Sequence, residues 1–125
     1  MLESASIGRD LSKNHCRGLY CESIVAQHYT KLGYIILGQR VKTPFAEVDL
    51  IIGKANQGEY SNLSLIEVKS VTGEAWYCHR ISRRQRERLI RAYTYLQAQF
   101  DQSLSFQMVL VTQDGALEII DDFLS

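Results

Sequence analysis

Residues 45–70 read FAEVDLIIGKANQGEYSNLSLIEVKS, in which two apolar segments, FAEVDLII and LSLIEVKS, flank a polar connection. Each apolar segment predicts a β-strand, yet each carries carboxylates where a core strand would carry valine or leucine. Side chains alternate between the two faces of a strand. Glu47 and Asp49 therefore share one face of the first strand, and Glu67 and Lys69 share one face of the second. Strand geometry thus clusters these charges.

We expect the two strands to pair as a hairpin about Gly58, in the register that keeps their apolar residues together. That register places three pairs opposite each other: Ile51 with Leu65, Asp49 with Glu67, and Glu47 with Lys69. Two carboxylates roughly 5 Å apart repel each other by about 3 kcal/mol at an effective dielectric constant near 20. A hard divalent cation such as Mg²⁺ would turn this repulsion into attraction. The pair therefore predicts a metal site.

The composition is that of an ordinary globular protein, with 125 residues, 46% of them hydrophobic and 22% charged. We expect a single domain over residues 1–125. No apolar run approaches the roughly 20 residues that span a bilayer, and the N-terminus lacks a signal-peptide pattern, so we expect no membrane contact. The three cysteines have no CxxC spacing, which favours reduced thiols and a cytoplasmic location.

The net charge of zero conceals an uneven distribution, because the last dozen residues are acidic and residues 80–91 are rich in arginine. A neutral chain has no strong overall field that would attract DNA. DNA binding would therefore depend on the local basic patch. Its candidate phosphate contacts are Arg80, Arg83, Arg84 and Arg86.

Residues 9–32 predict a helix, because apolar side chains recur along one stripe at spacings of three and four. Glu22 stands in the middle of that stripe and predicts a carboxylate that points inward. The alternative is that Glu22 lies at the rim of the core or pairs with an arginine. One turn earlier, Gly18 would allow a backbone or a ligand to approach closely.

A second helix, predicted at residues 81–100, carries Gln85 on its sheet-facing stripe. We expect Gln85 and Glu22 to converge on the same face of the sheet, with a satisfied buried amide as the alternative for Gln85. Besides the two acidic strands, with a polar surface loop between them at 53–62, strands are predicted at 34–41, 105–112 and 116–120. The order α, β, β, β, α, β, β is typical of an α+β or α/β domain, and we predict the α/β class, with a mixed central sheet flanked by helices.

Asp49, Glu67 and Lys69 form the pattern D…ExK, which suits the hydrolysis of a phosphodiester. A metal held by the two acids can polarise the phosphoryl oxygen and lower the pKa of a bound water. Lys69 can orient that water and offset the developing charge. The pattern alone is short, and it gains weight because Glu22 and Gln85 interrupt two other apolar stripes.

The segments GLYCESIVAQHYTKLGYIILGQR, FAEVDLII, LSLIEVKS and RQRERLIRAYTYL resemble the YraN-like family, also known as uncharacterised protein family 0102. That family is placed in the PD-(D/E)XK nuclease superfamily and is distantly similar to Holliday-junction resolvases. The resemblance implies a restriction-endonuclease-like αβββαβ core and cleavage of DNA, including branched DNA, with Mg²⁺ or Mn²⁺. It implies metal ligation by Asp49, Glu67 and the backbone carbonyl of Val68, a catalytic Lys69, a supporting Glu22, and Glu47 beside the metal.

The chain departs from the family pattern at three positions. The family usually has glycine at the positions of Cys21 and Ala46, and lysine is common at the position of Gln85. Gln85 keeps hydrogen-bonding capacity without the charge, which favours phosphate positioning over catalysis.

Two other interpretations remain at this level. One is an inactive nuclease fold that binds nucleic acid or acts as a scaffold, which the neutral net charge and the two absent glycines favour. The other is a buried ion-pair network, although three acids to one base is an unusual ratio for such a network. A two-fold substrate would suit a homodimer, but no segment identifies an interface.

Overall fold

The computed structural model describes residues 10–70 and 82–121. In chain order its elements are α1 (Asp10–Lys31), β1 (Ile35–Lys42), β2 (Glu47–Asn56), β3 (Glu59–Ser70), α2 (Arg83–Gln97), β4 (Ser105–Val111) and β5 (Leu117–Asp121). Neither helix in these ranges combines the length and the apolar character that a membrane-spanning helix needs.

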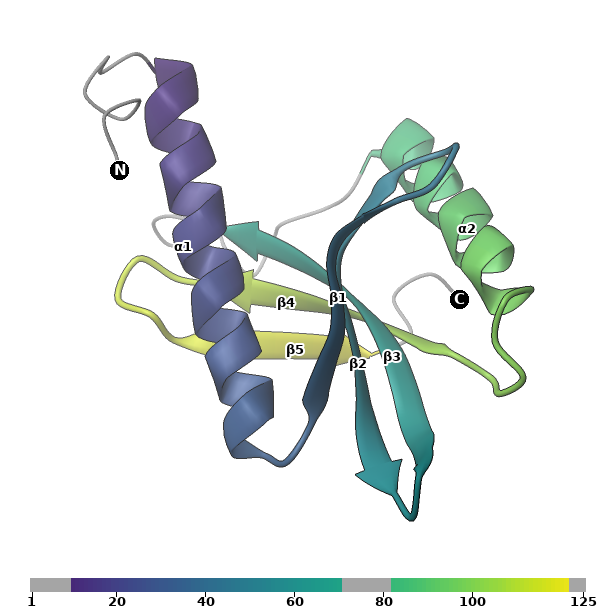
Figure 1. Cartoon of the computed structure of the whole chain (residues 1–125). Helices are drawn as coiled ribbons and strands as arrows, with labels where there is room; N and C mark the ends of the chain where they lie inside the picture. The colour runs from purple at the N-terminus through teal and green to yellow at the C-terminus, as the bar shows by residue number, and fades with distance from the viewer. Residues whose placement is uncertain (1–9, 71–81, 122–125) are drawn as a thin grey trace.

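The five strands form one sheet in the order β1-β2-β3-β4-β5 (Figure 1). Only β3 and β4 are parallel, and α2 lies in the crossover between them, whereas the other neighbours are antiparallel. A parallel pair needs such a crossover because a tight turn reverses the chain direction. The α/β class and the mixed sheet flanked by two helices are therefore confirmed, in agreement with an αβββαβ core.

The predicted hairpin of β2 and β3 is present, and its register is the predicted one where Ile51 lies opposite Leu65. The polar connection at residues 53–62 is much shorter than predicted, because both strands extend to the turn and Asn56 pairs with Glu59. Gln57 and Gly58 form the turn, with φ of 53° and 85°. Two consecutive residues at positive φ match the right-handed twist of the strands, so the turn needs no longer loop.

The strand β2 begins two residues later than predicted, because residues 43–46 form a turn. The Thr43 hydroxyl accepts hydrogen bonds from the backbone N–H groups of Phe45 and Ala46, at 3.1 and 3.0 Å. The backbone N–H of Thr43 donates to the Ala46 carbonyl at 3.1 Å. These bonds use the backbone groups that a strand would need for its ladder.

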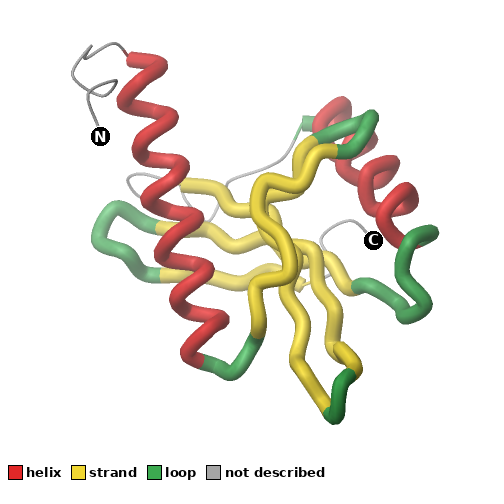
Figure 2. Tube along the Cα trace, viewed as in Figure 1, coloured by secondary structure: helices red, strands yellow, loops and turns green. Residues whose placement is uncertain are grey.

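Two buried clusters occupy the two faces of the sheet. The first joins one set of strand residues to α2, and it includes Val48, Ile51, Leu63, Leu65, Leu89, Ala92 and Leu96. The second joins the other set to α1, and it includes Leu50, Ile52, Ile66, Cys21, Val25 and Tyr29. The helices therefore cover opposite faces (Figure 2). The predicted convergence of Glu22 and Gln85 on one face is wrong, because successive strand residues point to different helices.

Gly18 does not provide the close approach that its place on the helix suggested. Within the part of the chain that the structure describes, no neighbouring atom lies within 4 Å of a Cβ built at this position, apart from the helix's own backbone and the adjoining residues. Gly58 also has open space, but its φ of 85° disfavours any side chain. The two glycines thus differ in backbone conformation while neither is sterically crowded.

This difference predicts opposite effects of the same substitution. We expect Gly58→Ala to lower the free energy of unfolding by about 1 kcal/mol, because an L-residue at positive φ is strained. We expect Gly18→Ala to raise it by up to about 1 kcal/mol, because alanine is the better helix former. Urea unfolding of both variants measures the pair, and a loss of stability in Gly18→Ala would reveal a contact that the described structure lacks.

Candidate functional site

The site lies where β2 and β3 separate. The backbone ladder between them ends at Leu50 and Ile66, whereas β3 stays paired with β4 as far as Ser70. Beyond the last pair, Asp49 reaches β3 through its side chain, and its Oδ2 accepts a hydrogen bond of 2.7 Å from the backbone N–H of Val68. The point at which the strands separate therefore holds the Asp49 carboxylate next to Glu67. We call Asp49, Glu67 and Lys69, together with Glu22 of α1, the acidic fork.

Glu67 is a buried carboxylate with unused hydrogen-bonding capacity. The residue is only 7% exposed, and its Oε2 lies 3.7 Å from the Nζ of Lys69. Its Oε1 is buried and has no hydrogen-bond partner among the described residues. Buried polar atoms are nearly always paired, so an orphaned carboxylate oxygen calls for an explanation. Here the oxygen lies in a site where a cation would supply the missing partner.

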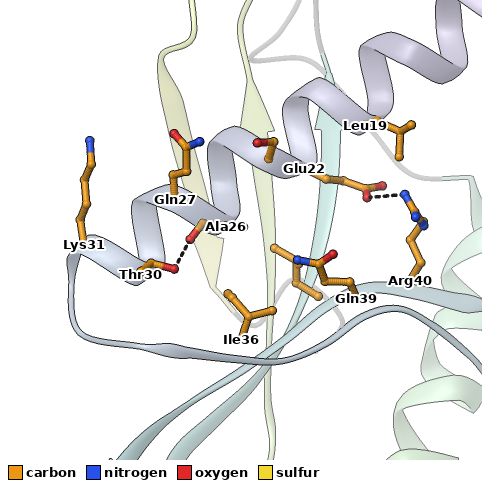
Figure 3. A pocket seen from close by; sticks show the side chains of 11 residues that line it. Leu19, Glu22, Ala26, Gln27, Thr30, Lys31, Ile36, Gln39 and Arg40 are labelled. Carbon is orange, nitrogen blue, oxygen red and sulfur yellow. Dashed lines mark hydrogen bonds and ion pairs between the residues drawn. The ribbon is translucent and has the colours of Figure 1, made fainter. Parts of the chain in front are cut away.

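Glu22 joins this group from α1, as its place on the apolar stripe predicted. Its side chain is 21% exposed and lies close enough to Asp49 for the Asp49 charge to raise its pKa. On its other side, Glu22 Oε1 lies 3.8 Å from an Nη of Arg40 in β1 (Figure 3). Glu22 therefore pairs with an arginine and also lies beside Asp49. The predicted inward-pointing carboxylate and the alternative of an arginine pair both apply to this residue.

Burial raises the pKa values of all three acids, and the charge of a neighbouring carboxylate adds to each shift. For Glu67 burial is the main cause and the Asp49 charge adds to it, raising the pKa to about 8. Glu22 has the same two main causes, and its pKa rises to about 7 although Arg40 opposes the shift. Burial also raises the pKa of Asp49, against the Val68 hydrogen bond and the Lys69 charge. Without a cation, the three acids cannot all ionise near neutral pH.

The donor set fits a hard divalent cation. Within residues 10–70 and 82–121, no three Asp, Glu, His or Cys side chains are grouped as a ready metal cluster. Mg²⁺ does not need one, because it commonly takes one or two carboxylates and keeps waters or substrate oxygens. Asp49 and Glu67, with an unpartnered buried oxygen between the strands, meet that requirement.

Glu47 does not form the predicted pair with Lys69. It is exposed at the start of β2, where the ladder between β2 and β3 has already ended. On the other edge of β2, it lies opposite Lys42 of β1. Its charge still contributes to the raised pKa values of Glu22 and Asp49. Its role beside a metal stays a prediction.

The arginines at the start of α2 are placed for an external anion. The first turn of α2 has no acidic residue, although its N-terminus is the positive end of the helix dipole. Arg83 and Arg84 are exposed, and Arg83 pairs only loosely with Glu87, at 3.9 Å. Arg86 is half-buried, and Arg80 lies outside the described residues. Clustered arginines at this helix end cost stability, which an incoming phosphate would relieve.

Gln85 lies on the half-buried side of this same turn. Its backbone N–H donates to the hydroxyl of the N-cap residue Ser82 at 3.1 Å. Along its stripe come Leu89, Ala92 and Leu96, which belong to the cluster under α2. The residue therefore lies at the rim of that cluster, and phosphate positioning by its side chain stays a prediction.

Sequence reasoning missed Arg40. Its place in a strand segment, LGQRV, next to Gln39 gave a signal, because two long polar residues interrupt an otherwise apolar strand. The pattern does not show which acid Arg40 pairs with, because Glu22 lies on a different element.

The neighbouring acids predict how stability depends on pH. A carboxyl whose pKa rises on folding contributes stability that is complete below its unfolded pKa and is lost as pH rises through its folded pKa. For Glu67 that window runs from 4.5 to about 8. With a chelator present, we expect the melting temperature to fall, by on the order of 5 °C, from about pH 5 to about pH 9.

The variant Glu67→Gln should flatten this dependence, because it keeps the shape of the side chain and removes the titrating group. Glu118→Gln makes the same change at an exposed position of β5 and should retain the wild-type slope. Equal slopes in Glu67→Gln and the wild type would contradict the raised pKa.

Residues 21–111 match the model of the uncharacterised protein family UPF0102. A UPF0102 protein of Granulibacter bethesdensis is 31% identical over 109 residues, covering 84% of this chain and 66% of its own length. One from Corynebacterium efficiens is 31% identical over 99 residues, covering 78% of each chain. One from Caulobacter vibrioides is 40% identical over 81 residues, covering 65% of this chain and 61% of its own length.

The match spans less than two thirds of the length of the Granulibacter and Caulobacter relatives. The match to the family model includes the whole of the acidic fork, since Glu22, Asp49, Glu67 and Lys69 all lie within residues 21–111. The chain belongs to the uncharacterised protein family UPF0102, the family that its sequence resembles.

Proposed function

We propose that this protein is a metal-dependent endonuclease that hydrolyses DNA phosphodiester bonds, with Mg²⁺ or Mn²⁺ as its cofactor. The observation that carries the proposal is the buried, unpartnered Oε1 of Glu67 in a fork that also holds Asp49 and Lys69. A purely structural sheet would gain by replacing these groups with apolar residues, because buried charges are expensive. Their retention in the core favours a functional site.

Asp49 and Glu67 are the residues that would hold the metal, with the Val68 carbonyl as a further predicted ligand. A bound divalent cation would polarise a phosphoryl oxygen and lower the pKa of a bound water. The hydrogen bond from the Val68 N–H keeps the Asp49 carboxylate in one orientation, at 2.7 Å. The site is thus preorganised by backbone on one side and by burial on the other.

Lys69 is the residue suited to act on the substrate. Its ammonium group lies 3.7 Å from Glu67, and its side chain is 24% exposed, so it is reachable from solvent. Three N–H donors on a flexible stem can orient a water and offset negative charge that develops on a phosphate. Glu22 would support the site from α1, where it lies next to Asp49 and pairs with Arg40.

DNA would be held by phosphate contacts from the start of α2. Arg83 and Arg84 are exposed there, and Gln85 and Arg86 lie beside them. Such contacts position a substrate without reading its sequence. They suit an enzyme that recognises DNA structure, such as a branch, and a DNA substrate agrees with the cytoplasmic location predicted from the sequence.

Cleavage assays test the proposal directly. We expect the purified protein to cleave branched DNA with Mg²⁺ or Mn²⁺, and Asp49→Asn or Lys69→Met to lower the rate by about 10²-fold or more. Asp101→Asn and Lys54→Met make the same changes outside the fork, in the α2–β4 connection and at the hairpin end of β2, and should keep activity. Circular dichroism would verify that each variant is folded.

Two outcomes would overturn the proposal. Equal cleavage by wild type and Asp49→Asn would point to a contaminating nuclease. Salt-dependent DNA binding without cleavage on linear, single-stranded or branched DNA with either metal would favour the inactive nucleic-acid-binding module.

Metal binding has a readout that is independent of activity. A cation that binds only the folded state at 100 times its dissociation constant stabilises the protein by about 2.7 kcal/mol. We expect Mn²⁺ to raise the melting temperature of the wild type, and Asp49→Asn and Glu67→Gln each to abolish most of the increase. An equal increase in the wild type and both variants would locate the metal elsewhere.

A further inference from the structure

A groove between α1 and β1 leads away from the acidic fork. Its volume is about 510 Å³, and Glu22 belongs to both the groove and the fork. In Figure 3 the side chains of Arg40 and Lys31 lie toward opposite ends of the groove, with the side chains of Gln27 and Gln39 between them. The groove is therefore continuous with the candidate site and carries a cation near each end.

The lining of the groove suits a phosphodiester backbone. Its cations and neutral polar side chains can contact phosphate oxygens, since Ser, Thr and Gln join Arg and Lys in most phosphate contacts. The polar lining includes Ser23, Gln27 and Gln39, and the half-buried Ile36 supplies apolar surface against which a sugar or base can pack. Glu22 is the one acid among the lining residues, and it is already paired with Arg40.

Arg40 has an unusual backbone conformation. Its φ is 46°, in the left-handed region that non-glycine residues seldom adopt. The pairing of β1 with β2 nevertheless continues on both sides, at Gln39 with Leu50 and at Val41 with Val48. The left-handed residue therefore interrupts the normal strand conformation without shifting the register, and the Arg40 guanidinium lies beside α1.

The ion pair between Arg40 and Glu22 leaves the guanidinium available. The two atoms are 3.8 Å apart, and the Arg40 side chain is 49% exposed. Ion pairs of this exposure contribute little to stability. A phosphate would be a better partner, because it can accept two parallel hydrogen bonds from a guanidinium.

We infer that the groove between α1 and β1 binds the phosphodiester backbone of the DNA strand that enters the fork, with Arg40 as its phosphate contact nearest the acids. Lys31 is the second contact, at the far end of the groove. This inference rests on the proposed function and deepens it, because it assigns the path of the substrate strand. Arg40 is a binding residue in this arrangement and takes no part in the chemistry.

The length of the groove agrees with a strand and exceeds what a single small anion needs. Glu22 and Lys31 are nine residues apart on α1, which corresponds to about 13 Å along the helix axis. One strand of duplex DNA carries a phosphate every 3.4 Å along its axis, so roughly three to four phosphates fit this distance. Two cations separated in this way favour a polyanion over one phosphate ion.

Binding is tested without cleavage, in chelator, by fluorescence anisotropy of labelled single-stranded and four-way-junction DNA over a range of salt. We expect Arg40→Gln and Lys31→Gln each to weaken binding by about tenfold. Each should also reduce the slope of log affinity against log salt by about 0.7 to 0.9, because one phosphate contact is lost. Arg40→Lys keeps the charge and should restore the slope.

Lys54→Gln is the matched control, because it removes one positive charge near the hairpin end of β2, outside both the groove lining and the arginine-rich helix, and should bind as the wild type does. Thermal unfolding would verify that Arg40→Gln is folded, and Arg40→Asn serves as a second neutral variant because asparagine tolerates positive φ.

The inference would be overturned if Arg40→Gln, Arg40→Asn and Lys31→Gln all bound DNA with the affinity and salt slope of the wild type. In that case, DNA binding and cleavage by the wild type would still support the proposed function. Competition by polyglutamate as strong as that by DNA would assign the groove to an acidic peptide and would also overturn it. No DNA binding by the wild type at any salt concentration, together with no cleavage, would remove the proposed function and the inference together.

Discussion

The hydrogen bond from the Val68 N–H to Asp49 is the constraint on which the site depends. The recorded backbone ladder between β2 and β3 ends before this point, so a side chain takes over the contact between the strands. That arrangement brings one carboxylate against β3, where Glu67 is already buried and next to Lys69. The acids are therefore close because of how the strands separate, and their raised pKa values follow from the closeness and the burial.

The fold tolerates the free-energy cost of burying these acids because the rest of the sheet buries apolar side chains. On one face, alternate residues of β2 and β3 pack against α2, and on the other they pack against α1. Because the fork interrupts the sheet itself, Asp49 can be reached from the α1 side by Glu22. A sheet with helices on both faces thus places an acidic site between its layers while keeping most of the core dry.

The departures from the family pattern have simple structural consequences. Cys21 is buried in the cluster under α1, and Ala46 takes part in the Thr43 turn through its backbone groups. Within the described ranges the non-glycine residues at positive φ are Arg40, Gln57 and Asn62, so neither position requires glycine for its conformation. The absence of these glycines is compatible with an intact fork.

The sequence alone determined the elements, their order and the most informative acids. Period-two alternation in FAEVDLII and LSLIEVKS predicted that their acids cluster, and the apolar register fixed Ile51 opposite Leu65. An interrupted helical stripe was enough to single out Glu22. These features are local, so they can be read from spacing along one segment.

Only the tertiary structure decided where the helices lie and which partners the charges find. The α1 and α2 helices cover opposite faces, so Glu22 and Gln85 belong to different sides of the sheet. Arg40 pairs with Glu22 although they are 18 positions apart, and Glu47 lies beyond the end of the β2–β3 pairing, so it does not form the expected pair with Lys69. These outcomes depend on strand separation and on packing between distant segments, which sequence periodicity does not encode.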